Sequence, residues 1–484
     1  MPSIAKIILD LSNRKPHDIA VVHEDRQLTF SELHASTNRL ARDFRQRGAK
    51  PGDFVTIALP NSIGFVEASI AAWKIGATPQ PVSARLPNIE LAAIIELAAP
   101  AILIGAKSDS MDPEACLPIG YTPSKNISDE NLTDIVSKSW KAPTSGGSTG
   151  RPKIIVAGAA GEFDFSAGEF PLRQMPDRTH LVTGPLYHNA PFSFSANALF
   201  TGNMIVIMTR FDAEETLRLI ERHHIDWMMM VPTMMLRIWK LPEAVRNSYD
   251  LSSLRIMLHL AAPCAQWLKE EWINWLGGDV VNELFGGTEA TGATWITGDE
   301  WLTHRGSVGK LMPGSSVKVL NENGQEVSNG TIGEIYLRPD NGAGTTYRYI
   351  GAESKPNSDG WESLGDMGYV DDEGYIYLSD RKTDMILAGG SNIYPAEVEA
   401  AIDAHPAVRS SAVIGLPDED LGQTVHAIVD APDEVDESAL LSFLTDRLVR
   451  YKIPRSVEFV SFPLRDDAGK TRRSALLAER VSNT

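Results

Sequence analysis

Cysteine is scarce in this chain: Cys116 and Cys264 are its two cysteines, and they lie far apart in the sequence. A disulfide-stabilised fold or a cysteine-rich metal centre needs closely spaced cysteines, so the sequence predicts neither. It predicts two reduced thiols in a cytoplasmic protein.

The chain also lacks long apolar runs and has fewer positive than negative charges. No stretch of about 20 apolar residues is present, and the N-terminus shows no secretory-signal pattern. The net charge is −18, because the chain has 45 Lys and Arg residues but 63 Asp and Glu residues. Such a chain is repelled by nucleic acids and anionic membranes, so we expect neither nucleic-acid binding nor membrane insertion. Any anion site has to be built locally from a few placed cations.

What is present indicates a globular protein of at least two domains. A chain of 484 residues is longer than a single hydrophobic core usually serves, and a content of 43% hydrophobic residues is typical of globular proteins. Helices and apolar strands are predicted to alternate up to about residue 330, which favours an α/β fold. A fully polar segment then precedes a new set of strands and helices. We therefore predict a domain over 1–380, a hinge at 381–384 and a second domain over 385–484.

The segment 144–153, Thr-Ser-Gly-Gly-Ser-Thr-Gly-Arg-Pro-Lys, is the most informative stretch. Glycines let backbone amides approach phosphate oxygens, hydroxyls add donors and Lys153 adds a compact cation. The segment is not a Walker A motif, because Pro152 stands directly before the lysine, where that motif needs a glycine. An ordinary surface loop would explain the glycines but not the closing Pro-Lys. The candidate polyphosphate ligands are Thr144, Ser145, Gly146, Gly147, Ser148, Thr149, Gly150 and Lys153.

Five further segments follow in order. They are Tyr-His-Asn-Ala-Pro-Phe at 187–192, Phe-Gly-Gly-Thr-Glu at 285–289, Gly-Trp with Gly-Asp at 360–366, Asp-Arg-Lys with Gly-Gly-Ser-Asn-Ile-Tyr-Pro-Ala-Glu-Val-Glu at 380–399, and Gly-Lys-Thr-Arg-Arg at 469–473. With the 144–153 loop they resemble the acyl-adenylate-forming superfamily of acyl-CoA synthetases, peptide-synthetase adenylation domains and luciferases, over about residues 15–475. The resemblance implies a large N-terminal α/β domain of several subdomains and a small, mobile C-terminal α+β domain, with the active site between them.

The resemblance also implies how ATP is held. The 144–153 loop would bind the β- and γ-phosphates, and Thr288 with Glu289 would bind phosphate and Mg²⁺, an ion commonly held by one carboxylate plus phosphate oxygens and water. Asp366 and Arg381 would hold the ribose. The adenine would lie between two segments, Phe285 with Gly286 and Ala261 with Ala262 and Pro263. The chain departs from the family pattern in having Phe285 for the usual Tyr, Leu364 for a common Thr, and no Gly in 261–263.

Lys470 and His188 are the candidates for the chemical step. The resemblance places His188 beside the substrate carboxylate and Lys470 between that carboxylate and the α-phosphate. A positive donor aimed at charge that develops between two anions lowers the barrier. Without the motif, a structural histidine near a strand end is the favoured explanation for His188, and the motif reverses that preference. The residues before Lys470 include Asp466 and Asp467, which we expect to lower the positive potential of this loop.

The second half-reaction and the acid pocket rest on fewer residues. The resemblance places Gly389 and Gly390 along a pantetheine tunnel, with CoA as co-substrate, and puts Thr383 at a hinge position that is usually Lys or Asp. The predicted pocket residues are His188, Phe192, Met234, Gly287 and Trp295. Five methionines in 228–235 suggest an adaptable wall for a bulky apolar acid, with a buried strand as the alternative explanation.

The leading hypothesis is therefore an ATP- and Mg²⁺-dependent, AMP-forming acid:CoA ligase. The alternative keeps the adenylation step but passes the acyl group to an amine, such as that of an amino acid, or to a carrier-protein thiol. A silent nucleotide or acyl sensor is disfavoured, because Lys470, Glu289 and Arg381 are all present. The sequence leaves a homodimer open.

Overall fold

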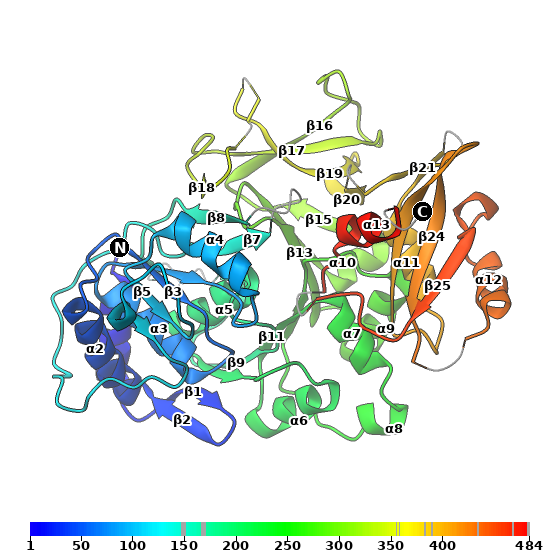
Figure 1. The fold of residues 1–484 in the computed structure, drawn as a ribbon. Helices are drawn as coiled ribbons and strands as arrows, with labels where there is room; N and C mark the ends of the chain where they lie inside the picture. The colour runs from blue at the N-terminus through cyan, green and yellow to red at the C-terminus, as the bar shows by residue number, and fades with distance from the viewer. Residues whose placement is uncertain are drawn as a thin grey trace.

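The structure is a computed structural model that describes most of the chain. The described residues are 1–146, 152–165, 171–354, 356–357, 359–381, 384–388, 391–432, 435–466 and 469–481. Figure 1 shows a large N-terminal part, in blue to yellow, and a smaller C-terminal part, in orange and red, at the side of the molecule away from the N-terminus.

A 13-stranded sheet runs through the N-terminal part. Its strands are, in spatial order, β16 (Ser315–Leu320), β17 (Gly333–Pro339), β19 (Glu362–Val370), β20 (Tyr375–Arg381), β15 (Ser307–Leu311), β14 (Ala293–Thr297), β13 (Val281–Gly286), β12 (Ile256–His259), β11 (Trp227–Met230), β9 (Thr179–Val182), β10 (Met204–Ile207), β1 (Ile19–His23) and β2 (Arg26–Thr29). The run from β13 to β1 is parallel, and the strands beyond both of its ends are antiparallel. The parallel run positions the site, because parallel strands present their carboxyl ends along one edge.

Two smaller sheets complete the N-terminal part. One is parallel and consists of β4 (Thr78–Pro81), β3 (Phe54–Ile57), β5 (Ile102–Ile104) and β6 (Cys116–Leu117). The other consists of β18 (Tyr347–Ile350), β8 (Pro152–Ala157) and β7 (Thr144–Gly146). The second sheet carries the ends of the glycine-rich loop.

Helices cover the parallel sheets. In the N-terminal part they are α1 (Ile4–Arg14), α2 (Phe30–Gln46), α3 (Ile63–Lys74), α4 (Asn88–Ala98), α5 (Asn189–Phe200), α6 (Ala213–His223), α7 (Pro232–Trp239), α8 (Glu243–Arg246), α9 (Gln266–Leu276) and α10 (Gly298–Thr303), with short 3₁₀ turns η1 (Pro113–Ala115) and η2 (Pro171–Arg173). A capping box begins α2: the Thr29 side chain accepts from the Glu32 amide, and the Glu32 side chain accepts from the Thr29 amide. All residues of β11 and β12 are buried, as expected for parallel strands covered on both faces.

The predicted alternation of helices and strands ends earlier than residue 330. After β13, which ends at Gly286, the chain forms the antiparallel strands β14 to β20, with the short helix α10 as the helix among them. Short turns suffice between antiparallel strands, whereas parallel strands need a crossover such as a helix. The sequence analysis missed this change because both kinds of strand are rich in apolar residues.

The C-terminal part has its own sheet. Its strands are β22 (Ser391–Ile393), β21 (Ile386–Ala388), β24 (Gly422–Asp430), β23 (Ser410–Asp418) and β25 (Ser456–Val460), and its helices are α11 (Pro395–Asp403), α12 (Glu437–Thr445), α13 (Arg473–Val481) and the 3₁₀ turn η3 (Arg450–Lys452). The chain leaves the large sheet at Arg381 and enters the small one at Ile386. The predicted hinge at 381–384 falls in this interval, and Thr383 lies outside the described residues. The predicted fold class is confirmed.

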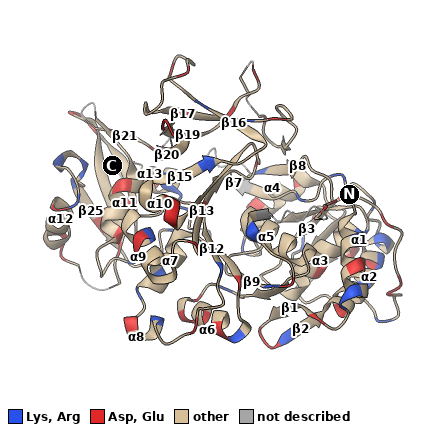
Figure 2. Ribbon diagram, turned by 180° about the vertical axis from the view of Figure 1, so that it is seen from behind, with Lys and Arg blue, Asp and Glu red and all other residues tan. Residues whose placement is uncertain are grey.

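Several helices carry charges of both signs. In Figure 2 basic and acidic residues are interspersed along α2, α6, α8 and α9. Both cysteines are free thiols, and burial raises the pKa of Cys264 to about 12. Of the helices in the described ranges, none combines the length and the apolar character needed to cross a membrane.

Candidate active site

The glycine-rich loop connects two paired strands. Strands β7 and β8 are antiparallel, with Ser145 opposite Lys153 and Gly146 opposite Pro152. Gln80 donates a hydrogen bond to Thr144 Oγ1 at 3.1 Å, which attaches β7 to the neighbouring sheet. The strand pairing therefore fixes both ends of the loop. The loop residues Gly147, Ser148, Thr149 and Gly150 lie outside the described residues.

Lys153 and Glu289, predicted from separate motifs, lie together. Lys153 Nζ is 3.5 Å from Glu289 Oε1, and the Tyr349 hydroxyl donates to the same oxygen at 2.6 Å. Lys153 also lies 4.0 Å from the centre of the Tyr349 ring. Burial, together with the bond to Glu289, raises the pKa of Tyr349, so its hydroxyl remains a donor. The sequence analysis missed Tyr349, which stands in a segment without a recognisable motif.

The donor set around Glu289 fits Mg²⁺. Glu289 is 7% exposed, and Thr288 beside it is half-buried. Across the described part of the chain, no group of three or more His, Cys, Asp or Glu side chains is arranged to hold a metal. One buried carboxylate beside a polyphosphate loop suits Mg²⁺, which keeps several waters and takes phosphate oxygens as ligands. The side chains present are thus compatible with the predicted Mg²⁺ role of Thr288 and Glu289.

The predicted ribose residues are neighbours across two strands. Asp366 on β19 stands directly opposite Arg381 at the end of β20. Asp366 is half-buried and follows Gly365, whose φ of +87° favours glycine. Two residues from separate motifs thus come together at one end of a hairpin, directly before the chain passes to the C-terminal part.

The two predicted adenine segments follow neighbouring parallel strands. β12 leads into Ala261, Ala262 and Pro263, and β13 ends with Phe285 and Gly286. Because the two strands are parallel and paired, both segments lie at the same edge of the sheet.

Two features of these segments come from the structure. The φ of Ala261 is +75°, a left-handed conformation that suits the glycine missing from this segment. Phe285 packs against a cluster that includes Ile335 and Leu337, so part of its ring is already covered by protein. Its stacking on adenine stays a prediction.

Gly287 lies where two side chains approach the backbone closely. A Cβ at this position would lie 2.4 Å from Leu364 Cδ1 and 3.1 Å from Glu289 Oε2. Leu364, which departs from the family pattern, therefore packs directly onto the 285–289 segment. The pocket role of Gly287 is not tested by this contact.

The remaining predicted pocket residues have different surroundings. His188 is half-buried, and it is the N-cap residue of α5 at the carboxyl edge beyond β9. Phe192, one turn into α5, is 3% exposed and packs against the rings of Trp73 and Trp140. Met234 is buried and Trp295 is half-buried. Their role as pocket residues stays a prediction.

The methionines of the 228–235 segment belong to the core. All five are at most 4% exposed and share one apolar cluster with helices α6, α7 and α9. Met228, Met229 and Met230 lie on the buried strand β11, as the alternative explanation given above expects, whereas Met234 and Met235 lie on helix α7. The flexibility of methionine lets it fill irregular space between packed helices and strands.

Lys141 is a buried lysine that the sequence analysis did not single out. Its Nζ donates to Asn189 Oδ1 at 2.5 Å and to Ser193 Oγ at 2.7 Å, both on α5 next to His188. Burial lowers the pKa of this ammonium to about 7. A lysine between Trp140 and Ala142, both buried, was the available signal in the sequence.

The loop that carries Lys470 has a defined turn. The Asp466 amide donates to the Lys470 carbonyl at 3.0 Å, and the Lys470 amide donates to Asp466 Oδ1 at 2.9 Å. The sequence analysis predicted only that Asp466 would reduce the positive potential. The structure adds that its carboxylate closes the turn. Asp467 lies outside the described residues.

This loop packs against the N-terminal domain. Gly469 has a φ of +74°, and a Cβ there would lie 3.0 Å from Thr233 Oγ1 and 3.1 Å from Val231 Cγ2. Both contacts stand at the junction of β11 and α7, on the carboxyl edge shared by β12 and β13. Lys470, which is exposed, is therefore presented at the same edge as the predicted adenine segments.

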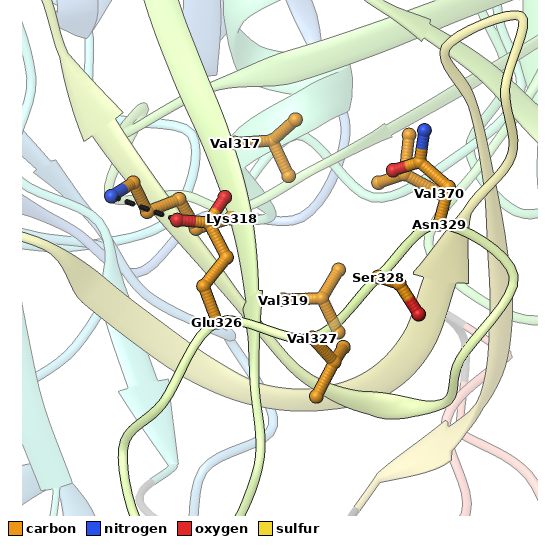
Figure 3. Close-up of a pocket in the computed structure, with 8 residues that line it drawn as sticks. All are labelled: Val317, Lys318, Val319, Glu326, Val327, Ser328, Asn329 and Val370. Carbon is orange, nitrogen blue, oxygen red and sulfur yellow. Dashed lines mark ion pairs between the residues drawn. The ribbon is translucent and has the colours of Figure 1, made fainter.

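Two predicted residues are not described, and one pocket lies apart from this edge. Gly389 and Gly390 are outside the described residues. Figure 3 shows a surface pocket of about 90 Å³ beside β16, in which Lys318 pairs with Glu326 at 3.1 Å. It is lined by Val317, Lys318, Val319, Glu326, Val327, Ser328, Asn329 and Val370, which include no predicted site residue.

Comparisons with known proteins identify the family of this chain. Residues 10–348 match the family model described as AMP-binding enzyme, and residues 397–470 match the AMP-binding enzyme C-terminal domain. A 2-succinylbenzoate–CoA ligase from Bacillus licheniformis is 31% identical, with 95% of this chain and 97% of that protein covered. A feruloyl-CoA synthase from Amycolatopsis is 30% identical, with 92% of each covered.

Solved structures share the fold over nearly the whole chain. The o-succinylbenzoate CoA synthetase of Bacillus subtilis, solved with its acyl-adenylate intermediate, has a TM-score of 0.79 at 25% identity and 98% coverage of both chains. An amide bond synthetase from Marinactinospora thermotolerans has a TM-score of 0.77 at 22% identity, with 99% of both chains covered, and at that identity shows the fold alone. The resemblance inferred from the motifs is confirmed, and this chain belongs to the AMP-binding enzyme family of the acyl-adenylate-forming superfamily.

Proposed function

We propose that this protein activates an apolar carboxylic acid with ATP and transfers the acyl group to CoA. The observation that carries the proposal is the convergence at one sheet edge of a phosphate-loop lysine, a buried carboxylate and the Lys470 loop of the C-terminal domain. Relatives named as 2-succinylbenzoate, ferulate and indoleacetate ligases support CoA as the acceptor. The acids in these names carry aromatic rings, which supports an apolar acid.

In the first half-reaction a carboxylate oxygen bonds to the α-phosphorus of ATP, and pyrophosphate leaves. Lys153 and the 144–153 loop bind the outgoing phosphates. Glu289 and Thr288 would hold Mg²⁺, which would supply positive charge to the phosphates. Lys470 offsets the charge that develops between the carboxylate and the α-phosphate. Asp366 and Arg381 hold the ribose.

In the second half-reaction the CoA thiol attacks the acyl carbon, its proton is lost and AMP leaves. The Gly389–Gly390 segment would admit the pantetheine arm after the C-terminal domain has rotated. We place the activity in the cytoplasm, where the two free thiols stay reduced.

The test is mass spectrometry of products formed from ATP, Mg²⁺ and a panel of apolar acids, in parallel with CoA and with mixed amino acids. We expect acid-dependent pyrophosphate release and an acyl-CoA product. The matched variant Lys470→Ala should lower the adenylation rate by about 10²–10³ while ATP affinity changes little. An acyl amide without thioester would assign the protein to the amide ligases, and absence of pyrophosphate release with every acid would refute the activity.

A further inference from the structure

Glu399 of α11 is a buried carboxylate that binds two arginines. It is 3% exposed. Its Oε1 accepts from Arg473 Nη2 at 2.9 Å and from the Val413 amide at 2.9 Å, and its Oε2 accepts from Arg465 Nη2 at 2.9 Å. Charge-assisted bonds to guanidinium groups are strong and directional, so this cluster holds both arginine side chains in fixed positions.

The two arginines stand on either side of the Lys470 loop. Arg465 immediately precedes the turn that Asp466 closes, and Arg473 follows it at the start of α13. Arg465 also approaches the Gly469 carbonyl at 3.5 Å. The carboxylate of Glu399 therefore fastens both ends of the loop to α11.

The same network reaches the start of the C-terminal domain. Arg473 Nη1 donates to Asp384 Oδ2 at 2.8 Å, and Arg465 Nη2 lies 3.7 Å from Asp403 Oδ2. Asp384 directly follows the segment that joins the two domains. The loop, α11 and the beginning of the domain are thus parts of one ionic cluster.

Helix α11 is in turn attached to the N-terminal domain. Lys240 donates to the carbonyls of Asp403 and Val408, and Trp267 Nε1 donates to the Ala400 carbonyl at 3.4 Å. Glu399 is therefore the connection between a helix docked on the N-terminal domain and the loop that presents Lys470 to that domain.

From these contacts we propose that Glu399 is a positioning residue for adenylation, which sets the place of Lys470 through Arg465 and Arg473. The role rests on the proposed function above. Misplacing a catalytic group by about 1 Å costs about 10² in rate, and removing one partner of a buried ion cluster leaves the others uncompensated. The second half-reaction does not need Lys470 at the α-phosphate, so it should depend much less on Glu399.

The test compares Glu399→Gln with Glu397→Gln, a change on the same helix. Glu397 is 46% exposed and pairs with Lys452 away from the loop. We expect Glu399→Gln to lower kcat for acid-dependent pyrophosphate release by about 10–10², with little change in the KM for ATP. Thioester formation from preformed acyl-adenylate should stay within about twofold. Glu397→Gln should change neither rate.

A double variant separates positioning from general stability. If Glu399 acts through Lys470, then Glu399→Gln should cause no further loss of adenylation in a Lys470→Ala background. Arg473→Lys loses the bidentate geometry. It should also slow adenylation selectively, but by a smaller factor than Glu399→Gln. Equal losses in both half-reactions with a lowered Tm, or an undiminished loss in the Lys470→Ala background, would overturn the positioning role. Wild-type protein that releases no pyrophosphate would overturn the proposed function instead.

Discussion

At the scale of single residues, burial of the Lys141 ammonium lowers the free energy of unfolding by an amount that depends on pH. Burial lowers its pKa from 10.5 to about 7 in the folded protein. Between these two values the unfolded chain binds more protons than the folded one, so the stability contributed by this group rises with pH. Below about pH 7 both states are charged and the full burial cost is present.

We therefore predict that Lys141→Met is more stable than wild type at pH 6, and that this advantage shrinks as the pH approaches 10. Urea unfolding of both proteins across this range measures the difference. Lys138→Met is the control, because Lys138 is exposed and its replacement removes a lysine without removing a buried charge. A constant offset for Lys141→Met would contradict the assigned burial cost.

Ala261 gives a second prediction at this scale. Its φ of +75° strains any residue with a Cβ, so Ala261→Gly should raise the free energy of unfolding by about 1 kcal/mol. Ala262 does not have a positive φ, and Ala262→Gly should lower stability because glycine adds freedom to the unfolded chain. Chemical denaturation of the two variants checks that their free energies of unfolding change in opposite directions.

At the scale of structural elements, the fit of the Lys470 loop onto the β11–α7 junction is sensitive to one methyl group. Gly469→Ala would place a Cβ 3.0 Å from Thr233 Oγ1 and strain a left-handed backbone. We expect the loop to move away and adenylation to fall by roughly 10-fold or more, with thioester formation from acyl-adenylate preserved.

Gly422→Ala is the matched control for this prediction. Gly422 has nearly the same φ, +77°, but a Cβ there would approach no heavy atom closer than 3.8 Å. This variant should lose about 1 kcal/mol of stability and leave the ratio of the two half-reaction rates unchanged. A similar change of that ratio in both variants would show that backbone strain, and not the contact with Thr233, is responsible.

The sequence predicted those features that depend on residues close together in the chain. The glycine-rich segment that ends at Lys153 could be recognised because it depends on residues close in sequence. The contact of Tyr349 with Glu289 could not be predicted, because it joins segments that are remote in sequence and no motif marks Tyr349. The antiparallel strands after Gly286 were missed for the same reason, since pairing direction is set by partners elsewhere in the chain.

At the scale of the whole molecule, the position of the C-terminal domain depends on a few contacts. Lys240 donates to carbonyls at and beyond the end of α11, where a cation also interacts favourably with the helix dipole. These acceptors are backbone groups, which leave no signature in the sequence. The arrangement of the two domains was therefore beyond sequence analysis, although both domains were recognised.

We predict that Lys240→Met weakens this arrangement. Loss of about 1–2 kcal/mol at the interface would lower its population roughly 5–30-fold relative to other arrangements. Adenylation should slow while thioester formation from acyl-adenylate does not. Small-angle scattering and the two half-reaction rates measure the effect, with Lys318→Met, at the remote pocket, as control. Equal slowing of both half-reactions would argue against a role for this contact in domain placement.

The ionic cluster around Glu399 makes the C-terminal domain an exchangeable part. Glu399, Arg465, Arg473 and Asp384 all follow the strand that leaves the large sheet, so a junction at 382–383 would keep them together. A C-terminal domain transplanted between relatives at this point would keep the ionic cluster that holds its lysine loop. Surface contacts with the N-terminal domain, such as that of Lys240, would need to be matched. Recombination could then join the acid selectivity of one N-terminal domain to the acyl-transfer half of another without rebuilding the catalytic lysine.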